Sequence, residues 1–259
     1  QLLVPEVEQH GTDIADVAAV AAANTDEVVT IQADLVAVND LMTYVSADTS
    51  TDAVVFSGAN VYVQSGYGKT DDDRTGLGNL IIGYDEDDGT DTKTGAHNLV
   101  VGPYHSYENA SSLVAGRDNE VVGHSIAFGY SNAAGHYSSA LGGYGNEATT
   151  GVVLGGTQNT ASSMYAVVLG GTSNEATGWY STVVGGHDNV ASDRHTAVLG
   201  GQGNEASDWY SAVVGGYENV ASGTSSAILG GYQNETVYNV ATVYGGKGQV
   251  ATHGYGYAP

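Results

Sequence analysis

The residues whose types could carry out chemistry stand in incomplete motifs. Gly68-Lys69-Thr70 resembles the end of a phosphate-binding loop, but the first glycine of that loop would stand at position 63, which is a valine. The run Gly123-His124-Ser125-Ile126-Ala127 lacks the closing glycine of a nucleophile elbow. The eight histidines are scattered without metal-ligand spacing. No constellation typical of an active site emerges, and we predict that the protein is not an enzyme.

Acidic residues gather in a short loop where carboxylates could bind a cation. Asp85, Asp87 and Asp88 stand close together before Gly89, and carboxylate oxygens are the ligands that Ca²⁺ prefers. An EF-hand loop needs ligands at alternate positions and a glycine at the sixth, whereas Gly89 is the fifth residue of this loop. Two interpretations remain: a calcium site made by the three aspartates, or a solvated acidic loop in a protein without a cofactor.

Aromatic residues stand out at one position of a repeating pattern. Both tryptophans of the chain lie in identical pairs, Trp179-Tyr180 and Trp209-Tyr210, with Arg194-His195 midway between them. If the chain between the pairs forms stacked turns at ~4.8 Å, the pairs lie roughly 10 Å apart on one face. Exposed aromatic rings bind sugars and proteins, so one interpretation is a binding strip for a glycan or a host protein. The other is packing between protomers or between adjacent solenoid edges.

The aromatic pairs stand within a series of short sequence repeats, and the fold of these repeats positions them. From residue 152 onward the chain repeats every 15 residues, with an aliphatic run, a Gly-Gly pair and, three residues later, an asparagine. A period this short cannot hold a pair of helices or a propeller blade, so it predicts a mainly β fold, a β-solenoid with two short strands per turn. Looser copies reach back to residue 79 and bring the total to about twelve turns.

Glycine and asparagine have separate roles in such a solenoid. Glycine is needed at corners where φ is positive or where stacked backbones approach closely. Stacked asparagine side chains hydrogen-bond to one another and to the corner backbone. We therefore predict a structural asparagine ladder, made by Asn159, Asn174, Asn189, Asn204, Asn219 and Asn234.

A different pattern occupies the N-terminal part of the chain. Residues 14–45 place mostly apolar residues at alternating spacings of three and four, which predicts a coiled-coil helix. The expected core of the coiled coil includes Ile14, Val17, Asn24, Val28, Ile31, Leu35, Val38 and Val45. Most of the d positions carry Val or Ile, which favour three or four strands over two, and Asn24 would set the register. We predict a parallel homotrimeric stalk.

The two patterns together resemble a known family. The repeat Ser-Ala-Val-Val-Gly-Gly-Tyr-x-Asn-x-Ala-Ser-Gly, found at residues 211–223, resembles the parallel β-roll heads of YadA-type trimeric autotransporter adhesins. The β-branched heptads with Asn at d are similar to the stalks of the same family. The resemblance covers residues 14–45 and about 79–251. It implies a left-handed parallel β-roll joined to a trimeric coiled coil, in an adhesive fibre on a cell surface.

Charge excludes two classes of partner and points to a compartment. The 259 residues carry 29 acids and 6 bases, a formal charge of -23, whereas nucleic acids and anionic membranes are bound by clusters of Lys and Arg. There is no cysteine and no apolar run long enough to span a membrane. Residues 1–48 hold nine acids and no Lys or Arg, so parallel helices would repel one another unless salt or divalent cations screen them. This charge, and a start at Gln1 instead of Met, predicts a secreted, extracellular protein.

These observations predict five segments. They are an extended N-terminal segment (1–11), the coiled-coil stalk (12–46), a neck (47–78), the β-roll head (79–251) and a C-terminal tail (252–259). The extended segment could add as a strand to a neighbouring trimer and so produce a head-to-tail filament. We expect a homotrimeric structural or adhesive fibre, either a subunit of an extracellular filament or a surface adhesin. The alternatives are a carbohydrate-binding tip, like that of a phage fibre, and an ice-binding solenoid.

Overall fold

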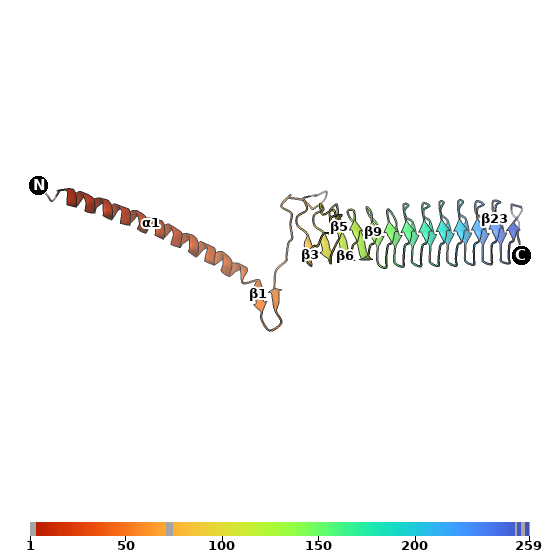
Figure 1. Ribbon diagram of the computed structural model, residues 1–259, viewed down its shortest axis with the longest axis horizontal. Helices are drawn as coiled ribbons and strands as arrows, with labels where there is room; N and C mark the ends of the chain where they lie inside the picture. Colours follow the sequence, from red (N-terminus) through yellow and green to blue (C-terminus); the bar gives the residue numbers. More distant parts are fainter. Residues whose placement is uncertain (1–3, 71–74, 252, 255–256, 259) are drawn as a thin grey trace. The chain divides into compact units, whose positions relative to one another are not determined.

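The chain folds into two compact units, which divide between Tyr62 and Val63. The computed structural model describes residues 4–70, 75–251, 253–254 and 257–258, with side chains between residues 15 and 254. Figure 1 shows a helix and a hairpin in the N-terminal unit and a stack of parallel turns in the C-terminal unit.

The N-terminal unit consists of a long helix followed by a β-hairpin. Helix α1 spans Val4–Leu41, and the hairpin pairs β1 (Val45–Asp48) antiparallel with β2 (Ala53–Phe56). In the hairpin turn the Asp48 carboxylate accepts hydrogen bonds from the Ser50 hydroxyl (2.6 Å), the Thr51 hydroxyl (2.9 Å) and the Ser50 backbone N–H (2.9 Å). These bonds, that of the Ser50 hydroxyl most of all, favour the charged carboxylate and lower the pKa of Asp48.

Both ends of α1 differ from the sequence-based expectation. The predicted extended segment covers residues 1–11, but the helix begins at Val4. Pro5 is compatible with the first turn, because proline has a helical φ and its missing N–H would have no partner there. The predicted stalk runs to residue 46, yet Val45 is the first residue of β1, where it pairs with Phe56 instead of extending the helix. Residues 1–3 of the predicted strand-adding segment lie outside the described chain.

The C-terminal unit is a parallel β-solenoid of about 11 turns, close to the twelve expected. A thirteen-stranded sheet forms one side of it, with β3 (Leu80–Ile82), β4 (Leu99–Val101), β6 (Leu113–Arg117), β8 (Ile126–Tyr130), β10 (Ser139–Ala140), β12 (Val152–Val153), β14 (Val167–Val168), β16 (Thr182–Val183), β18 (Ala197–Val198), β20 (Ala212–Val213), β22 (Ala227–Ile228), β24 (Thr242–Val243) and β26 (Tyr257–Ala258).

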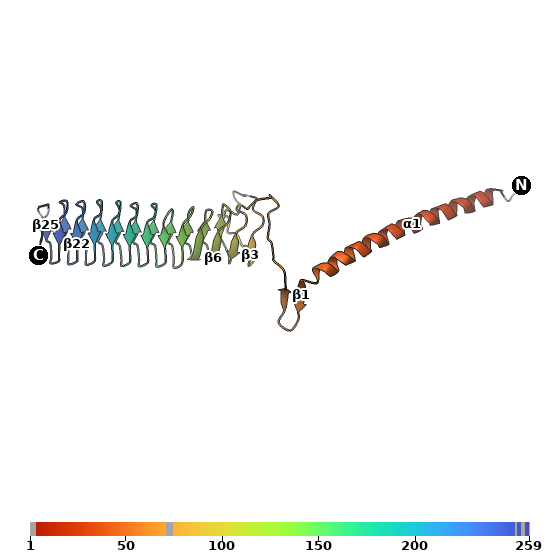
Figure 2. The same ribbon diagram turned by 180° about the vertical axis from the view of Figure 1, so that it is seen from behind.

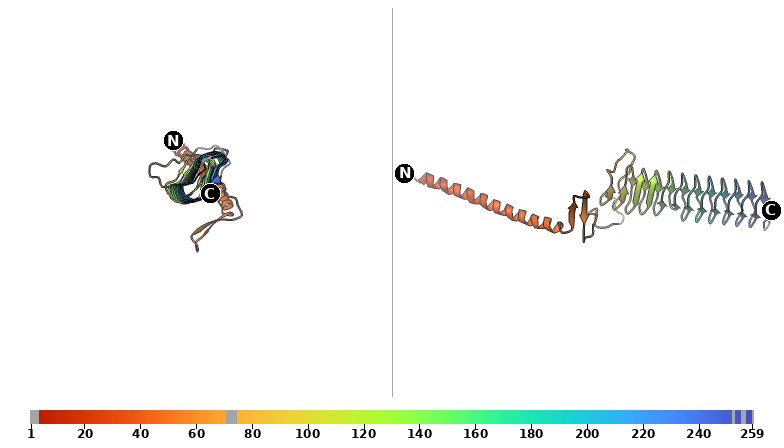
Figure 3. Two further views of the ribbon diagram at one scale, coloured as in Figure 1. Left: turned by 90° about the vertical axis from the view of Figure 1, so that its right-hand side faces the viewer. Right: turned by 90° about the horizontal axis from the view of Figure 1, so that it is seen from below.

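An eleven-stranded sheet forms the other side. Its strands are β5 (Ser106–Tyr107), β7 (Glu120–Val121), β9 (Ala133–Ala134), β11 (Glu147–Ala148), β13 (Thr160–Ala161), β15 (Glu175–Ala176), β17 (Val190–Ala191), β19 (Glu205–Ala206), β21 (Val220–Ala221), β23 (Glu235–Thr236) and β25 (Val250–Ala251). Each strand pairs with the strand one turn away, in register (Figure 2). Viewed end-on, successive turns overlie one another (Figure 3, left).

The solenoid core is narrow and uniform. In the regular turns, one valine or isoleucine of the thirteen-stranded sheet and one small residue of the other sheet point inward, as Val168 and Ala176 do. Because side chains alternate along a strand, the residues on either side of the buried valine point outward. The aliphatic run Val167-Val168-Leu169 therefore contributes only its middle residue to the core and presents Val167 and Leu169 on the outer face.

The predicted asparagines stack as a buried ladder at one corner. Asn204, for example, donates from Nδ2 to the Gly200 carbonyl of its own turn (2.9 Å) and to the Gly216 carbonyl of the next turn (3.0 Å). Its Oδ1 accepts the backbone N–H of Asn219 (3.0 Å), and the backbone N–H of Asn204 donates to Asn189 Oδ1 (3.0 Å). All six predicted asparagines are buried. The amides therefore satisfy corner backbone groups that water cannot reach.

The ladder begins with a histidine and ends with a glutamine. His105 occupies the ladder position one turn before Asn119, whose backbone N–H donates to His105 Nδ1 (3.1 Å). His105 Nε2 bonds the Val101 carbonyl four residues earlier (3.0 Å), as asparagine Nδ2 does in later turns. At the other end the Gln249 backbone N–H donates to Asn234 Oδ1 (2.8 Å).

The two glycines of each Gly-Gly pair have different environments. Gly171 has φ +92°, and a Cβ there would overlap the Gly186 carbonyl of the next turn, so only glycine fits. Gly170 has no positive φ, and a Cβ there would meet nothing closer than the Gly155 carbonyl at 4.0 Å. The chain's own fold therefore explains the second glycine of the pair and not the first.

Candidate functional site

The four predicted aromatic residues come together at one corner of the solenoid. This corner joins each strand of the eleven-stranded sheet to the next strand of the thirteen-stranded sheet. It carries two neighbouring columns of side chains. The Trp column contains Met164, Trp179, Arg194 and Trp209, and the Tyr column contains Tyr165, Tyr180, His195 and Tyr210, each column with one residue per turn.

Arg194 lies between the two tryptophans of the Trp column. Its Cζ is 5.0 Å from the ring centroid of Trp179 and 5.5 Å from that of Trp209. Both are cation–π distances, and tryptophan is the ring that binds cations best. The site prediction contains only the aromatic residues, although Arg194 occupies the same repeat position, so the 15-residue spacing is the signal that could have found it.

The Tyr column is a continuous stack of rings. The centroids of Tyr165 and Tyr180 are 4.8 Å apart, those of Tyr180 and His195 are 5.0 Å apart, and those of His195 and Tyr210 are 4.9 Å apart. The planes of His195 and Tyr210 differ by only 2°. This stack matches the spacing of parallel strands, so the rings and the backbone share one repeat.

The backbone of the corner is held in an unusual conformation. Tyr180, His195 and Tyr210 have φ of 58°, 58° and 59°, in the left-handed region that bulky residues rarely adopt. Each donates its backbone N–H to the Trp-column residue one turn earlier, as His195 does to the Trp179 carbonyl (2.9 Å) and Tyr210 to the Arg194 carbonyl (3.1 Å). These bonds tie the two columns together from turn to turn.

The corner is open to solvent and forms a shallow cavity. Trp179 and Trp209 each keep 49% of their surface exposed. Both tryptophans line a cavity of about 300 Å³, together with Arg194, Asp193, Ser163, Thr177 and Ser192. Asp193 accepts the Arg194 backbone N–H through Oδ1 (2.6 Å). Among the described residues, no carboxylate forms an ion pair with the Arg194 guanidinium.

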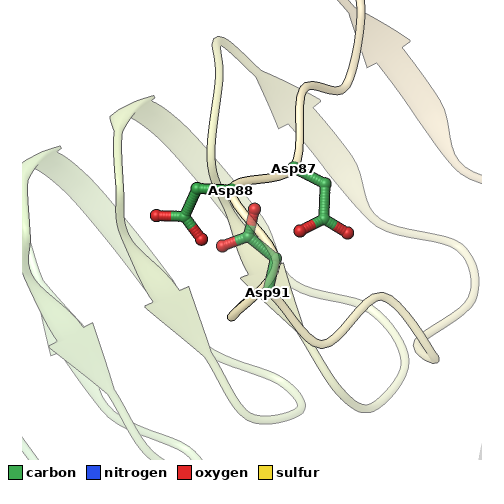
Figure 4. A group of neighbouring side chains, drawn as sticks. All are labelled: Asp87, Asp88 and Asp91. Carbon is green, nitrogen blue, oxygen red and sulfur yellow. The ribbon is translucent and has the colours of Figure 1, made fainter.

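The predicted calcium ligands do not all come together. Asp85 turns toward Lys93, whose Nζ lies 3.1 Å from Asp85 Oδ1, and it accepts the Tyr107 hydroxyl (2.9 Å). Asp87 and Asp88 instead gather with Asp91, each with a carboxylate oxygen within 4.8 Å of the others. Figure 4 shows Asp91 between the other two. The ion pair with Lys93 removes Asp85 from the set, and Asp91 is the residue that sequence reasoning missed.

Asp91 is the most buried member of this acidic cluster. Its Oδ2 is buried and has no hydrogen-bond partner. Burial raises its pKa, and the charges of Asp88 and Asp87 raise it further, because each disfavours another negative charge nearby. Asp88 behaves oppositely, since the Thr90 hydroxyl bonds its carboxylate (2.6 Å) and lowers its pKa. Three carboxylates in this arrangement match the oxygen ligands of a hard cation, and calcium binding stays a prediction.

The predicted core residues of the stalk are exposed on α1. Val17, Val28, Ile31, Leu35 and Val38 lie in the helix and are each more than half exposed, and Asn24 is also exposed. The side chain of Ile14 lies outside the described part of the chain, and Val45 belongs to β1. The heptad pattern therefore leaves an apolar seam that the described residues of the N-terminal unit do not cover.

A second apolar surface runs along the thirteen-stranded sheet. We call it the sheet seam, and its exposed members are Leu141, Leu154, Leu169, Val184, Leu199, Val214, Leu229 and Tyr244. The half-exposed side chains of Val152 and Val167 lie on the same face, two residues before Leu154 and Leu169. The outer face of the eleven-stranded sheet instead carries glutamates in alternate turns, such as Glu175 and Glu205.

Fold and site together define a parallel β-solenoid repeat protein with an aromatic corner and an N-terminal helix. No family model matches the chain, and no curated protein is significantly similar to it. Among the described helical residues, none forms a helix that is long and apolar enough to cross a membrane.

Proposed function

We propose that the protein is an extracellular homotrimeric fibre with a structural or adhesive role, not an enzyme. The observation that carries the proposal is that each unit presents an apolar seam with no cover within the described chain. Contiguous apolar surfaces of this kind mark interaction sites. The apolar seam of α1 runs along the helix, and the sheet seam runs from turn to turn across the strands, so each offers a continuous apolar surface to neighbouring chains.

The partner we propose is two further copies of this chain. β-branched residues at the d positions Val17, Ile31 and Val38 favour three or four strands over two, and we propose three. Parallel sheets are ordinarily covered on both faces, whereas no described residue of the C-terminal unit covers the outer face of the thirteen-stranded sheet. The first glycines of the Gly-Gly pairs follow the sheet seam, and their lack of a Cβ would let neighbouring backbones approach there.

Charge and resemblance support the location and the role. The N-terminal unit has acids and no Lys or Arg, so a bundle of three such helices needs a saline or divalent-rich exterior that screens the charge. The resemblance to YadA-type trimeric autotransporter adhesins fits the same interpretation. We further propose that such trimers join head to tail into a filament.

The test of the proposal is the mass of the particle in solution. Light scattering after size-exclusion chromatography is expected to give three times the 26.4-kDa mass of the chain. Val214→Asp in the sheet seam should reduce this mass or cause partial dissociation, because it buries a carboxylate against a neighbour. The matched control is Val220→Asp on the outer face of the other sheet, where the mass should not change. A monomeric parent protein at physiological salt would refute the fibre.

A ligand-binding module is the second candidate, and the aromatic corner favours it. Half-exposed tryptophans beside a cavity are typical of carbohydrate-binding surfaces, as at the tip of a fibre. An ice-binding solenoid would need a flat array of threonines. At the corner that carries the Gly-Gly pairs, Thr157 and Thr172 stand in successive turns, but the following turns replace them by His187 and Gln202. The two roles are compatible, since a trimeric fibre can carry the binding corner.

A further inference from the structure

We propose that the corner formed by Trp179, Arg194 and Trp209 binds a saccharide that carries an isolated carboxylate. Suitable groups are a hexuronic acid or a sialic acid on an otherwise neutral glycan. The inference deepens the adhesive role and rests on the proposed function. It is carried by the position of one cation between the only two tryptophans of the chain.

The guanidinium of Arg194 is positioned to bind a carboxylate. The indoles of Trp179 and Trp209 lie on either side of it along the column, at 5.0 and 5.5 Å. Stacking uses the faces of a guanidinium and leaves the N–H groups at its edge free to bind a carboxylate with two parallel hydrogen bonds. Since no described carboxylate pairs with Arg194, these donors are available to a ligand.

The rest of the cavity suits a sugar ring. The exposed halves of both indoles offer apolar faces, on which the C–H face of a pyranose stacks. Ser163, Thr177 and Ser192 line the same cavity and supply hydroxyls that both donate and accept. A ligand with one carboxylate, several hydroxyls and an apolar ring face would therefore match the guanidinium, the hydroxyls and the indoles of the corner.

The surrounding charge selects a ligand with one carboxylate over a polyanion. Arg194 is the only Lys or Arg between residues 118 and 246, a stretch that holds ten acidic residues. Asp193 and Asp208 stand directly beside the Trp column, next to Arg194 and Trp209. A densely sulfated chain would gain one ion pair and meet several like charges, which oppose its binding.

The corner is also preorganised. The left-handed backbone at His195 and Tyr210 is fixed by hydrogen bonds to the preceding turn, and the rings of these two residues stack on each other. A ligand therefore does not have to order the loops that hold the two indoles, which lowers the cost of binding. In a trimer, three equivalent corners would add avidity for a glycan-coated surface.

Intrinsic tryptophan fluorescence tests the inference directly, because both tryptophans of the chain lie in the corner. The probes are sialyllactose, a glucuronic-acid-terminated disaccharide, lactose as the neutral control and a sulfated heparin fragment as the polyanion. At least one carboxylated probe should change the fluorescence in a saturable way. Lactose and the heparin fragment should bind at least tenfold more weakly. If neither carboxylated probe changes the emission, the inference is wrong.

Variants distinguish specific recognition of the carboxylate by Arg194 from a general effect of removing one positive charge from the protein. Arg194→Gln should weaken binding of the carboxylated probe at least tenfold, and Arg194→Lys, which cannot form the paired hydrogen bonds, should weaken it less. The matched control is Lys247→Gln, which removes a cation 4.9 Å over the Tyr232 ring at the opposite corner and should bind as the parent does. Circular dichroism confirms that each variant is folded. Unchanged affinity in both Arg194 variants overturns the inference.

The particle mass, measured on the same samples, separates the two proposals. A trimer that binds none of the carboxylated probes overturns this inference and leaves the fibre standing. A monomer that binds sialyllactose or the glucuronate probe, and loses binding with Arg194→Gln, supports the inference and overturns the fibre.

Discussion

The backbone N–H of Asn119 donates to Nδ1 of His105 over 3.1 Å, while His105 Nε2 bonds the Val101 carbonyl. A backbone N–H can bond only an unprotonated nitrogen, so the ring is neutral and carries its proton on Nε2. Burial lowers the pKa of His105 below its ordinary value of 6.5, although the hydrogen bond to the Val101 carbonyl and the charges of Asp91 and Asp85 partly oppose the shift. The first rung of the ladder is therefore sensitive to acid.

Acid is expected to destabilise the solenoid through this rung. Because the pKa of His105 is lowered in the folded state, the unfolded chain binds the proton more readily, and the free energy of unfolding falls as the pH drops below about 6.5. His105→Asn replaces the ring with the ladder residue of later turns and should reduce this loss. The measurement is the urea midpoint at about pH 7.5 and about pH 5. His136→Asn, at an exposed ring that forms no ion pair with a described carboxylate, is the control and should keep the parent's pH dependence.

Each ladder asparagine is expected to contribute to the stability of the solenoid. Asn204→Ala removes the groups that bond the Gly200 and Gly216 carbonyls and the Asn219 backbone N–H, all from a buried position. We expect a loss of ~1–3 kcal/mol in the free energy of unfolding, since buried polar groups are left without partners. Thermal or urea unfolding measures it. Gln202→Ala, exposed in the same turn, should change stability little, and equal effects of the two substitutions would contradict the ladder's role.

The two glycines of one corner are expected to respond differently to alanine. Gly171→Ala places a methyl group against the Gly186 carbonyl at a positive φ, so we expect a loss of about 1–3 kcal/mol or misfolding. Gly170→Ala has open space within the chain and should fold with nearly the parent's stability. Urea unfolding of both variants tests the difference. If Gly170→Ala folds yet loses the oligomeric state in light scattering, the first glycine lies in an interface between chains.

The seam of α1 is expected to hold the stalk together. Ile31→Asp combined with Val38→Asp should dissociate the N-terminal helices, because several buried carboxylates in one layer cannot be desolvated together. Val36 is also exposed but lies off the heptad positions, so Val36→Asp is the control and should not change the mass of the particle. An intact trimer in the double variant would show that the sheet seam alone maintains the assembly.

The solenoid is well predicted because the same short pattern of aliphatic residues, glycines and asparagine recurs in turn after turn. The asparagine after each Gly-Gly pair occupies the same buried place in turn after turn, as Asn159 and Asn204 show. A repeat pattern does not, however, identify a turn in which another residue type takes the place of the asparagine. His105 fills a ladder position without matching the asparagine pattern, because what the position requires is an acceptor and a donor at the right distance and not an amide.

The parts that sequence reasoning missed depend on contacts between different turns. Arg194 lies within cation–π distance of tryptophans 15 residues away in either direction, and only the repeat spacing, not its residue type, marks it as part of the aromatic site. Asp85 leaves the acidic cluster because Lys93, eight residues later, folds back onto it. The end of α1 was ambiguous because Val45 suits a heptad and a strand equally well, and pairing with Phe56 decides between them.

The narrow core has a mechanical consequence. Each regular turn buries little more than one valine and one alanine, as Val168 and Ala176 show, and it contacts only the turns before and after it. A turn therefore adds ~4.8 Å to the solenoid axis when folded. Once unravelled, its 15 residues extend to about 50 Å. Tension applied to the two ends of the solenoid would release turns one after another, so the protein would yield gradually and lengthen many times over before its chain is taut.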